Sequence, residues 1–73
     1  MCMEKFAERL KELRAAKGIS AVDLGKAIGV SDATIIRWEN NNHDIIGENI
    51  IKLAKYFEVP TDYLLGLINE PYW

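Results

Sequence analysis

The spacing of helix-ending residues is the feature of this sequence that most limits its fold. Glycine occurs at positions 18 and 29, an asparagine run occupies 40–42, and a proline stands at position 60. Between these breaks the apolar residues recur with the 3.6-residue period of an α-helix, and no segment of useful length alternates with the two-residue period of a strand. The sequence therefore predicts an all-α fold of five short helices.

The predicted helices have recognisable starts and ends. They run over residues 4–17, 21–28, 32–40, 46–57 and 62–67. Ser20 and Ser31 offer hydroxyl groups that can cap the second and third helices, and Thr61 can do the same for the fifth. The fourth helix is expected to bury an apolar stripe made of Ile46, Ile50, Leu53, Ala54 and Phe57.

The length and composition predict one folded domain. A chain of 73 residues has room for a single core, here residues 4–67, followed by a short tail at 68–73. With 49% hydrophobic and 27% charged residues, the chain is expected to be globular. It has no apolar run long enough to span a bilayer and no apolar signal core at its N-terminus, which predicts a cytoplasmic protein.

Residues that carry enzyme chemistry do not form a recognisable group. The sequence has no nucleophile motif and no phosphate-binding loop, and its single histidine, His43, has no plausible partner for acid–base work. Cys2 is the single cysteine, so neither an internal disulfide nor a zinc cluster is expected. We therefore expect no enzyme activity, no metal site and no cofactor.

The second and third predicted helices meet the spatial requirements of a helix-turn-helix. In this unit two short helices are joined by a tight turn, and the second helix can enter the major groove of DNA. Counted from Ala21, the fifth position must be small because the helices nearly touch there, and it is Gly25. The ninth must adopt the turn conformation, and it is Gly29. The inner positions are all apolar: Leu24, Ile28, Val30, Ile35 and Trp38.

These segments also resemble a known family. Residues 19–25 and 28–40 are similar to the helix-turn-helix of the phage Cro and lambda-repressor-like family, also called the xenobiotic-response-element family. Residues 48–59 and 62–66 look like that family's last two helices. The resemblance implies a five-helix bundle that binds an operator in double-stranded DNA, usually as a symmetric dimer, and regulates transcription, most commonly as a repressor.

Four positions depart from the family pattern. Glutamine is frequent where this chain has Ala21, alanine at Gly25, serine at Ile36, and glycine at Asn41. Ala21 has no side chain that could hydrogen-bond to DNA, so one contact that the resemblance implies is lost. Gly25 keeps the close approach of the two helices but costs about 1 kcal/mol of helix propensity.

The third helix carries the predicted base-reading face. Ile35 and Trp38 are expected to point inward, which leaves outward the four residues Asp32, Ala33, Ile36 and Arg37. Arg37 is the strongest candidate, because a guanidinium can donate two hydrogen bonds to guanine, worth roughly 1–3 kcal/mol of discrimination. Ala33 and Ile36 can contact thymine methyl groups. Asp32 has two interpretations, as an acceptor from a cytosine amine or as a charge that favours its own helix N-terminus.

Contacts with the DNA backbone are expected at helix starts and in the loop after the third helix. The predicted positions are Ala21, Thr34, Asn40, Asn41, Asn42 and His43. The asparagine run is equally well explained as a solvated turn. Arg14, Lys17 and Lys26 can add positive potential near the phosphates, although any surface helix bears such charges.

The net charge of −2 disfavours DNA binding at first sight. However, the first 40 residues contain seven Lys and Arg against six Asp and Glu, whereas the last 33 contain two against five. The acidic excess therefore lies after the predicted reading helix. The acidic total and the changes at Ala21 and Ile36 keep open an alternative function, that of a protein-interaction module such as an antitoxin-like or antirepressor partner.

The C-terminal segment predicts a homodimer. Residues 64–68 and 71–73 contain more apolar side chains than a small core needs, so some can form a two-fold contact. Two reading helices would then lie about 34 Å apart on a pseudo-palindromic site. Alternatively, Leu64 and Leu67 complete the monomer core, and Tyr72 and Trp73 only extend into solvent.

Overall fold

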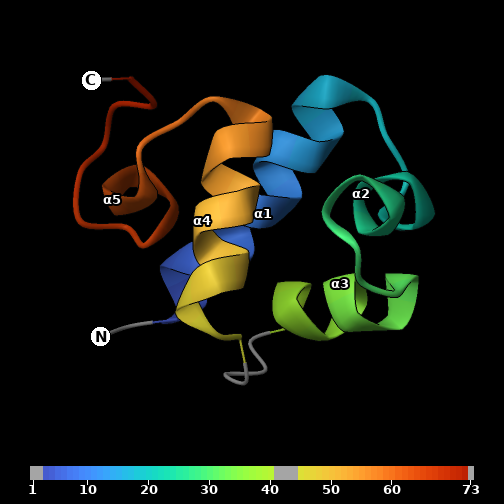
Figure 1. Cartoon of the computed structure of the whole chain (residues 1–73). Helices are drawn as coiled ribbons and strands as arrows, with labels where there is room; N and C mark the ends of the chain where they lie inside the picture. Colours follow the sequence, from blue (N-terminus) through green and yellow to red (C-terminus); the bar gives the residue numbers. More distant parts are fainter. Residues whose placement is uncertain (1–2, 41–44, 73) are drawn as a thin grey trace.

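The computed structural model describes residues 3–40 and 45–72, and their regular structure is entirely helical (Figure 1). The five helices are α1 (Met3–Lys17), α2 (Ala21–Ile28), α3 (Asp32–Glu39), α4 (Gly47–Phe57) and α5 (Thr61–Leu64). Both the all-α prediction and the five predicted helices are confirmed.

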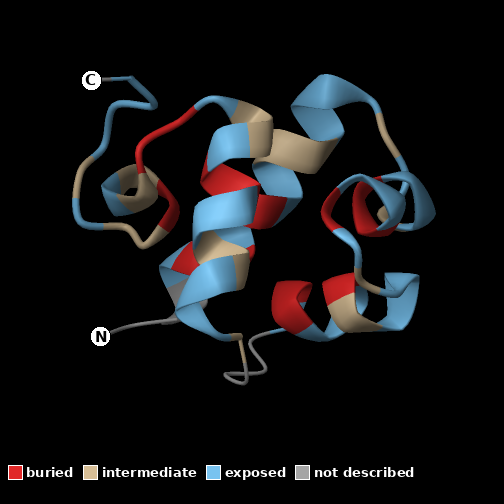
Figure 2. Cartoon of the chain, in the orientation of Figure 1, coloured by how far each residue is buried: buried red, intermediate tan, exposed pale blue. Residues whose placement is uncertain are grey.

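The helices surround one apolar core. α3 contacts α2 and α1, while α4 contacts α2 and α5, and α5 also contacts α1. Figure 2 shows the buried residues on the sides of the helices that face one another. The largest side chains of this core that are almost fully buried are Phe6, Leu10, Leu24, Ile35, Trp38, Leu53 and Leu64.

Local signals fix the α2–α3 unit as the sequence predicts. The Ser20 hydroxyl accepts a hydrogen bond from the Asp23 backbone N–H at 3.0 Å, and the Asp23 carboxylate accepts one from the Ser20 backbone N–H. Ser31 caps α3 by accepting from the Thr34 backbone N–H at 3.2 Å. Gly29 ends α2 with a left-handed backbone, φ +83°, which glycine adopts without a steric penalty.

Gly25 permits the closest approach within this unit. A Cβ atom at this position would lie 2.5 Å from the backbone carbonyl oxygen of Val30, in the turn between α2 and α3. A contact that short with backbone forces the two segments apart. The predicted requirement for a small fifth position is therefore confirmed, and in this chain the requirement is for glycine.

The fourth helix begins near Ile46 as predicted, but the predicted burial of Ile46 is wrong. α4 begins at Gly47, and Ile46 is its extended N-cap residue, with a side chain that is 60% exposed. A residue in extended conformation does not continue the helical stripe, so Ile46 is not part of the core. Leu53 and Ala54 are buried as predicted, whereas Ile50 and Phe57 are half-buried.

The fifth helix differs more from its prediction. Pro60, and not Thr61, is the N-cap residue, and no side chain caps this end. The helix ends at Leu64, because Gly66 takes a left-handed backbone at φ +84° and a Cβ atom there would overlap the Lys5 side chain. Leu67 therefore lies outside the helix and is 65% exposed, so it does not complete the core.

Candidate nucleic-acid interface

α3 presents one face to the core and the opposite face to solvent. Ile35 and Trp38 are almost fully buried, as predicted. The predicted reading residues are all exposed: Asp32, Ala33, Ile36 and Arg37. Ile36 is 47% exposed and is one of six large hydrophobic residues that are exposed in the described part of the chain. Figure 1 places α3 at the edge of the molecule, which agrees with the exposure of these four residues.

The N-terminus of α3 is closed by its own side chains. The Ser31 and Thr34 hydroxyl groups lie 2.9 Å apart and share a hydrogen bond, in addition to the backbone cap. Thr34 is half-buried, so its hydroxyl is held by the cap and is less available to a phosphate than the sequence suggests. Asp32 lies in the first turn, near the positive end of the helix dipole, and both interpretations of its role stay open.

The C-terminus of α3 is fixed by a partly buried ion pair between Arg14 and the buried Glu39. Arg14 on α1 donates from Nε to Oε2 of Glu39 at 2.7 Å and from Nη2 to Oε1 at 3.0 Å. The same guanidinium donates from Nη1 to the carbonyl oxygen of Ile19 at 3.2 Å. Hydrogen bonding to Glu39 raises the pKa of Arg14 against the opposing effect of burial. The Arg14 guanidinium thus joins α1 to the end of α3 by two hydrogen bonds and to the segment before α2 by a third.

The ion pair confirms that Glu39 is structural, and it corrects the role suggested for Arg14. A charge already bound to Glu39 adds little positive potential for phosphates. Lys17 is also placed elsewhere than expected, because its ammonium lies 5.1 Å from the ring centre of Tyr56, on α4. Lys26 is exposed on α2, as the prediction requires.

The predicted backbone contacts are only partly described. Ala21 is the half-buried first residue of α2, and Asn40 is exposed at the end of α3. Asn41, Asn42 and His43 lie outside the described residues. Within the described residues no cluster of three His, Cys, Asp or Glu side chains could hold a metal ion. None of the described helices is both long and apolar enough to cross a membrane.

One buried cation was missed by the sequence analysis. Arg9 on α1 is 9% exposed, donates from Nη1 to the carbonyl oxygens of Tyr63 at 2.7 Å and Ile68 at 3.1 Å, and lies 4.1 Å from the centre of the Tyr63 ring. A signal for its burial exists, because Arg9 lies one turn from Phe6 and from Leu13 on the apolar side of the first helix. Arg9 attaches the C-terminal segment to α1.

A tight two-helix unit with an exposed second helix defines a helix-turn-helix domain. The family model described as "Helix-turn-helix" matches residues 10–64, and the chain belongs to this family.

Two proteins of known sequence are similar to this chain over most of its length. It is 35% identical to Repressor protein C2 of Salmonella phage P22 over 65 residues, which are 89% of this chain and 30% of that protein. It is 27% identical to the uncharacterized HTH-type transcriptional regulator YobD of Bacillus subtilis over 66 residues, which are 90% of this chain and 59% of YobD. The chain thus spans less than two thirds of the length of each of these relatives.

Two solved structures have the same fold. The P22 c2 repressor, in complex with a synthetic operator, superposes with a TM-score of 0.78 and 37% identity over 82% of this chain and 91% of the repressor chain. The restriction-modification controller protein C.AhdI of Aeromonas hydrophila gives a TM-score of 0.77 and 32% identity over 85% and 94% of the two chains.

Proposed function

We propose that this protein is a sequence-specific regulator that binds double-stranded DNA with α3 in the major groove and acts as a transcriptional repressor. The observation that carries the proposal is the exposed outer face of α3, held by buried Ile35 and Trp38 and fixed at its end by the Arg14–Glu39 ion pair. A rigid helix with one free face is what readout of base edges requires. The similarity to a repressor solved on its operator supports the same function.

The residues proposed to read bases are Asp32, Ala33, Ile36 and Arg37. Arg37 donates to a guanine, and Ala33 and Ile36, one turn apart, form an apolar surface for thymine methyl groups. Ala21, through its main-chain N–H, and Thr34 and residues 40–43 are proposed to contact the phosphate backbone. The domain, with its core at 4–67, has no catalytic role in this proposal, and it acts in the cytoplasm, where bacterial and phage operators lie.

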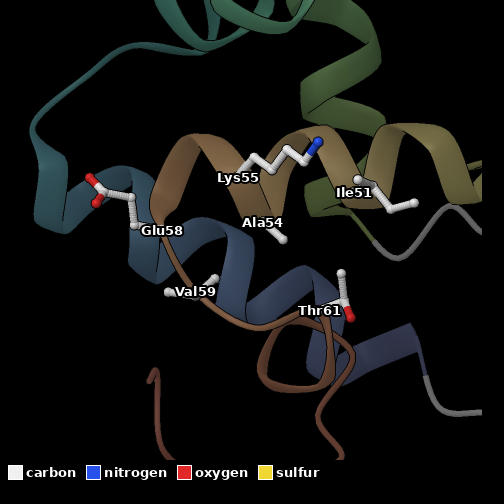
Figure 3. A pocket seen from close by; sticks show the side chains of 6 residues that line it. All are labelled: Ile51, Ala54, Lys55, Glu58, Val59 and Thr61. Carbon is white, nitrogen blue, oxygen red and sulfur yellow. The ribbon is translucent and has the colours of Figure 1, made fainter. Parts of the chain in front are cut away.

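We further propose that two copies bind a pseudo-palindromic operator. Leu67, at the end of the core segment, and Tyr72, in the tail, are 65% and 64% exposed, so both are available for a two-fold contact. A groove of about 440 Å³ lies between α4 and the segment that leads into α5. Figure 3 shows the side chains that line it: Ile51, Ala54, Lys55, Glu58, Val59 and Thr61. Ile51 in this groove is 50% exposed, and a largely apolar groove of this kind is suited to a second copy.

A selection of random duplexes by the intact chain, at low and at physiological salt, tests the function. The expected result is an enriched pseudo-palindrome whose affinity falls steeply with salt, because phosphate contacts release counterions. Arg37→Ala should weaken binding to the selected site by about 10- to 100-fold. Lys11→Ala, at an exposed position of α1, is the matched control and should leave affinity unchanged. Absence of any enriched sequence would overturn the proposal.

A second candidate is a protein-interaction module on the same scaffold. The half-exposed Ile36 and the missing side-chain donor at Ala21 favour it, since both weaken the reading surface for DNA. Salt separates the two functions, because an apolar protein contact is insensitive to salt over the range in which DNA binding weakens steeply. Replacing the thymines of a selected site by deoxyuracil gives a second criterion, since only DNA readout by Ala33 and Ile36 depends on the methyl groups.

A further inference from the structure

A second surface lies between α2 and α4, apart from the outer face of α3. It is a hollow of about 550 Å³, lined by Ala27, Ile28, Lys52, Lys55 and Tyr56. Its α4 side belongs to the C-terminal half of that helix, which Figure 1 shows at the opposite edge of the molecule from α3. A duplex held by α3 therefore leaves this hollow open.

Lysine side chains border the hollow, although the C-terminal part of the chain has an acidic excess. Lys52 and Lys55 are the two Lys or Arg residues of the last 33, and both line this hollow. Lys17 joins them from α1, with its ammonium 5.1 Å from the centre of the Tyr56 ring. Neither Lys52 nor Lys55 forms an ion pair with another residue of the described ranges.

The surroundings of the hollow are apolar rather than acidic. Ala27 and Ile28 come from the end of α2, and the Tyr56 ring comes from α4. The acidic residue of α4 is Glu48, one helical turn before Lys52, and Glu58 follows the helix and lines the neighbouring groove; neither of them lines the hollow. Figure 3 shows Glu58 pointing away from Lys55. The hollow thus combines three positive charges with an apolar centre.

We propose that this lysine-bordered hollow, defined by Lys17, Lys52, Lys55 and Tyr56, binds an acidic segment of a partner protein. Carboxylates of the segment pair with the three ammonium groups, and an apolar side chain of the segment packs against Tyr56 and Ile28. A protein fits better than a nucleic acid, because a phosphate backbone has no apolar side chain to bury there. The domain then has two interfaces, α3 for DNA and the hollow for a protein, and the second does not depend on the first.

Backbone amide NMR shifts of the intact chain, measured without DNA, test this inference. The probe is a short synthetic peptide of Glu and Asp with one central Leu, and a peptide with Gln and Asn in place of the acids is the ligand control. With the acidic peptide we expect saturable shifts confined to Lys17 and to residues 27–28 and 52–56. We expect none with the neutral one.

Variants make the test specific. Lys52→Glu combined with Lys55→Glu should weaken peptide binding by about tenfold or more, and Lys52→Arg with Lys55→Arg should preserve it. Lys11→Glu, which changes an exposed lysine of α1, is the charge-matched control and should have little effect. An unchanged amide spectrum elsewhere verifies the fold of each variant.

Three outcomes would overturn the inference. The first is a change in the amide shifts of α3 on addition of the peptide, which would mean that the peptide binds the surface proposed for DNA. The second is equal loss of affinity in the Lys11→Glu control and in the double charge reversal. The third is displacement of the peptide from the hollow by a nonspecific duplex, which would assign the surface to nucleic acid. None of them bears on whether α3 selects an operator, so the two proposals fail separately.

Discussion

The helix-turn-helix unit and the C-terminal segment are held in place by different kinds of interaction. α2 and α3 are delimited by caps and a glycine turn within a few residues of each other, and one ion pair to α1 then fixes the end of α3. α5 has four residues and no side-chain cap, and Arg9 of α1 attaches the segment that follows it. The first region is specified locally and then anchored, whereas the second depends on its anchor.

The largest expected effect comes from removing the anchor of α3. Arg14→Ala leaves the Glu39 carboxylate buried without a partner, and this should cost about 3 kcal/mol of unfolding free energy. The measurement is urea denaturation followed by circular dichroism. The Arg14→Met/Glu39→Gln double variant should recover part of the loss, because no unpaired charge remains. A double variant less stable than Arg14→Ala alone would contradict this account.

Removing the anchor of the C-terminal segment should have a smaller and more local effect. Arg9→Met breaks two charge-assisted hydrogen bonds to carbonyl oxygens, which should cost about 2 kcal/mol. Amide hydrogen exchange should accelerate at Leu65 and Leu67, whose N–H groups donate to Thr61 and Asp62. Protection in α3 should change only by the global loss of stability.

This prediction distinguishes the two regions directly. Equal acceleration at Ile35 and Leu67, beyond that global loss, would show that the C-terminal segment and the helix-turn-helix are one cooperative unit. Arg9→Lys is the conservative control, because it keeps a cation near the carbonyl oxygens and should retain part of the protection.

The contrast also explains which parts of the fold were predictable. Ser20, Ser31 and Gly29 act within their own helix or turn, so a sequence pattern shows their role directly. Arg14 and Glu39 are 25 residues apart, and Arg9 and Ile68 are 59 apart. No helical period relates such residues, so these pairs could not be found from the pattern.

The errors at the fourth and fifth helices have local causes. Ile46 is apolar and has the phase of the buried stripe of α4, so the pattern alone predicts that it belongs to the helix. In the structure Gly47 is the first helical residue. Gly66 takes a left-handed backbone, which is typical of the end of a helix, but the leucines on either side of it favour a longer helix in the sequence pattern. On α3, the expected burial of Ile35 and Trp38 sufficed to predict which residues face outward. The base-reading role proposed for the outward residues depends on a DNA partner that the sequence does not contain.

Two glycines allow a sharper test of the close packing in the helix-turn-helix. Gly25→Ala gains about 1 kcal/mol of helix propensity, yet its Cβ atom would press on the Val30 carbonyl oxygen, and overpacking of this kind costs about 1–3 kcal/mol. We expect a net loss of thermal stability. Gly47→Ala is the matched control, because a Cβ atom there meets nothing within 4 Å and the helix gains propensity. Equal stability changes in the two variants would mean that α2 and α3 can move apart at little cost.

The smallest expected effect comes from the cap of the reading helix. Ser31→Ala removes the acceptor of the Thr34 N–H and the partner of the Thr34 hydroxyl, which should cost about 1 kcal/mol. Ser20→Ala removes the equivalent cap of α2 and should cost a similar amount. Only the change at Ser31 should alter the affinity for a selected operator, since α3 carries the proposed reading face. Calorimetric unfolding and duplex titration of both variants measure the two effects. If both lower operator affinity equally, the first turn of α2 contributes as much to DNA binding as the first turn of α3, and the role proposed for the main chain at Ala21 gains weight.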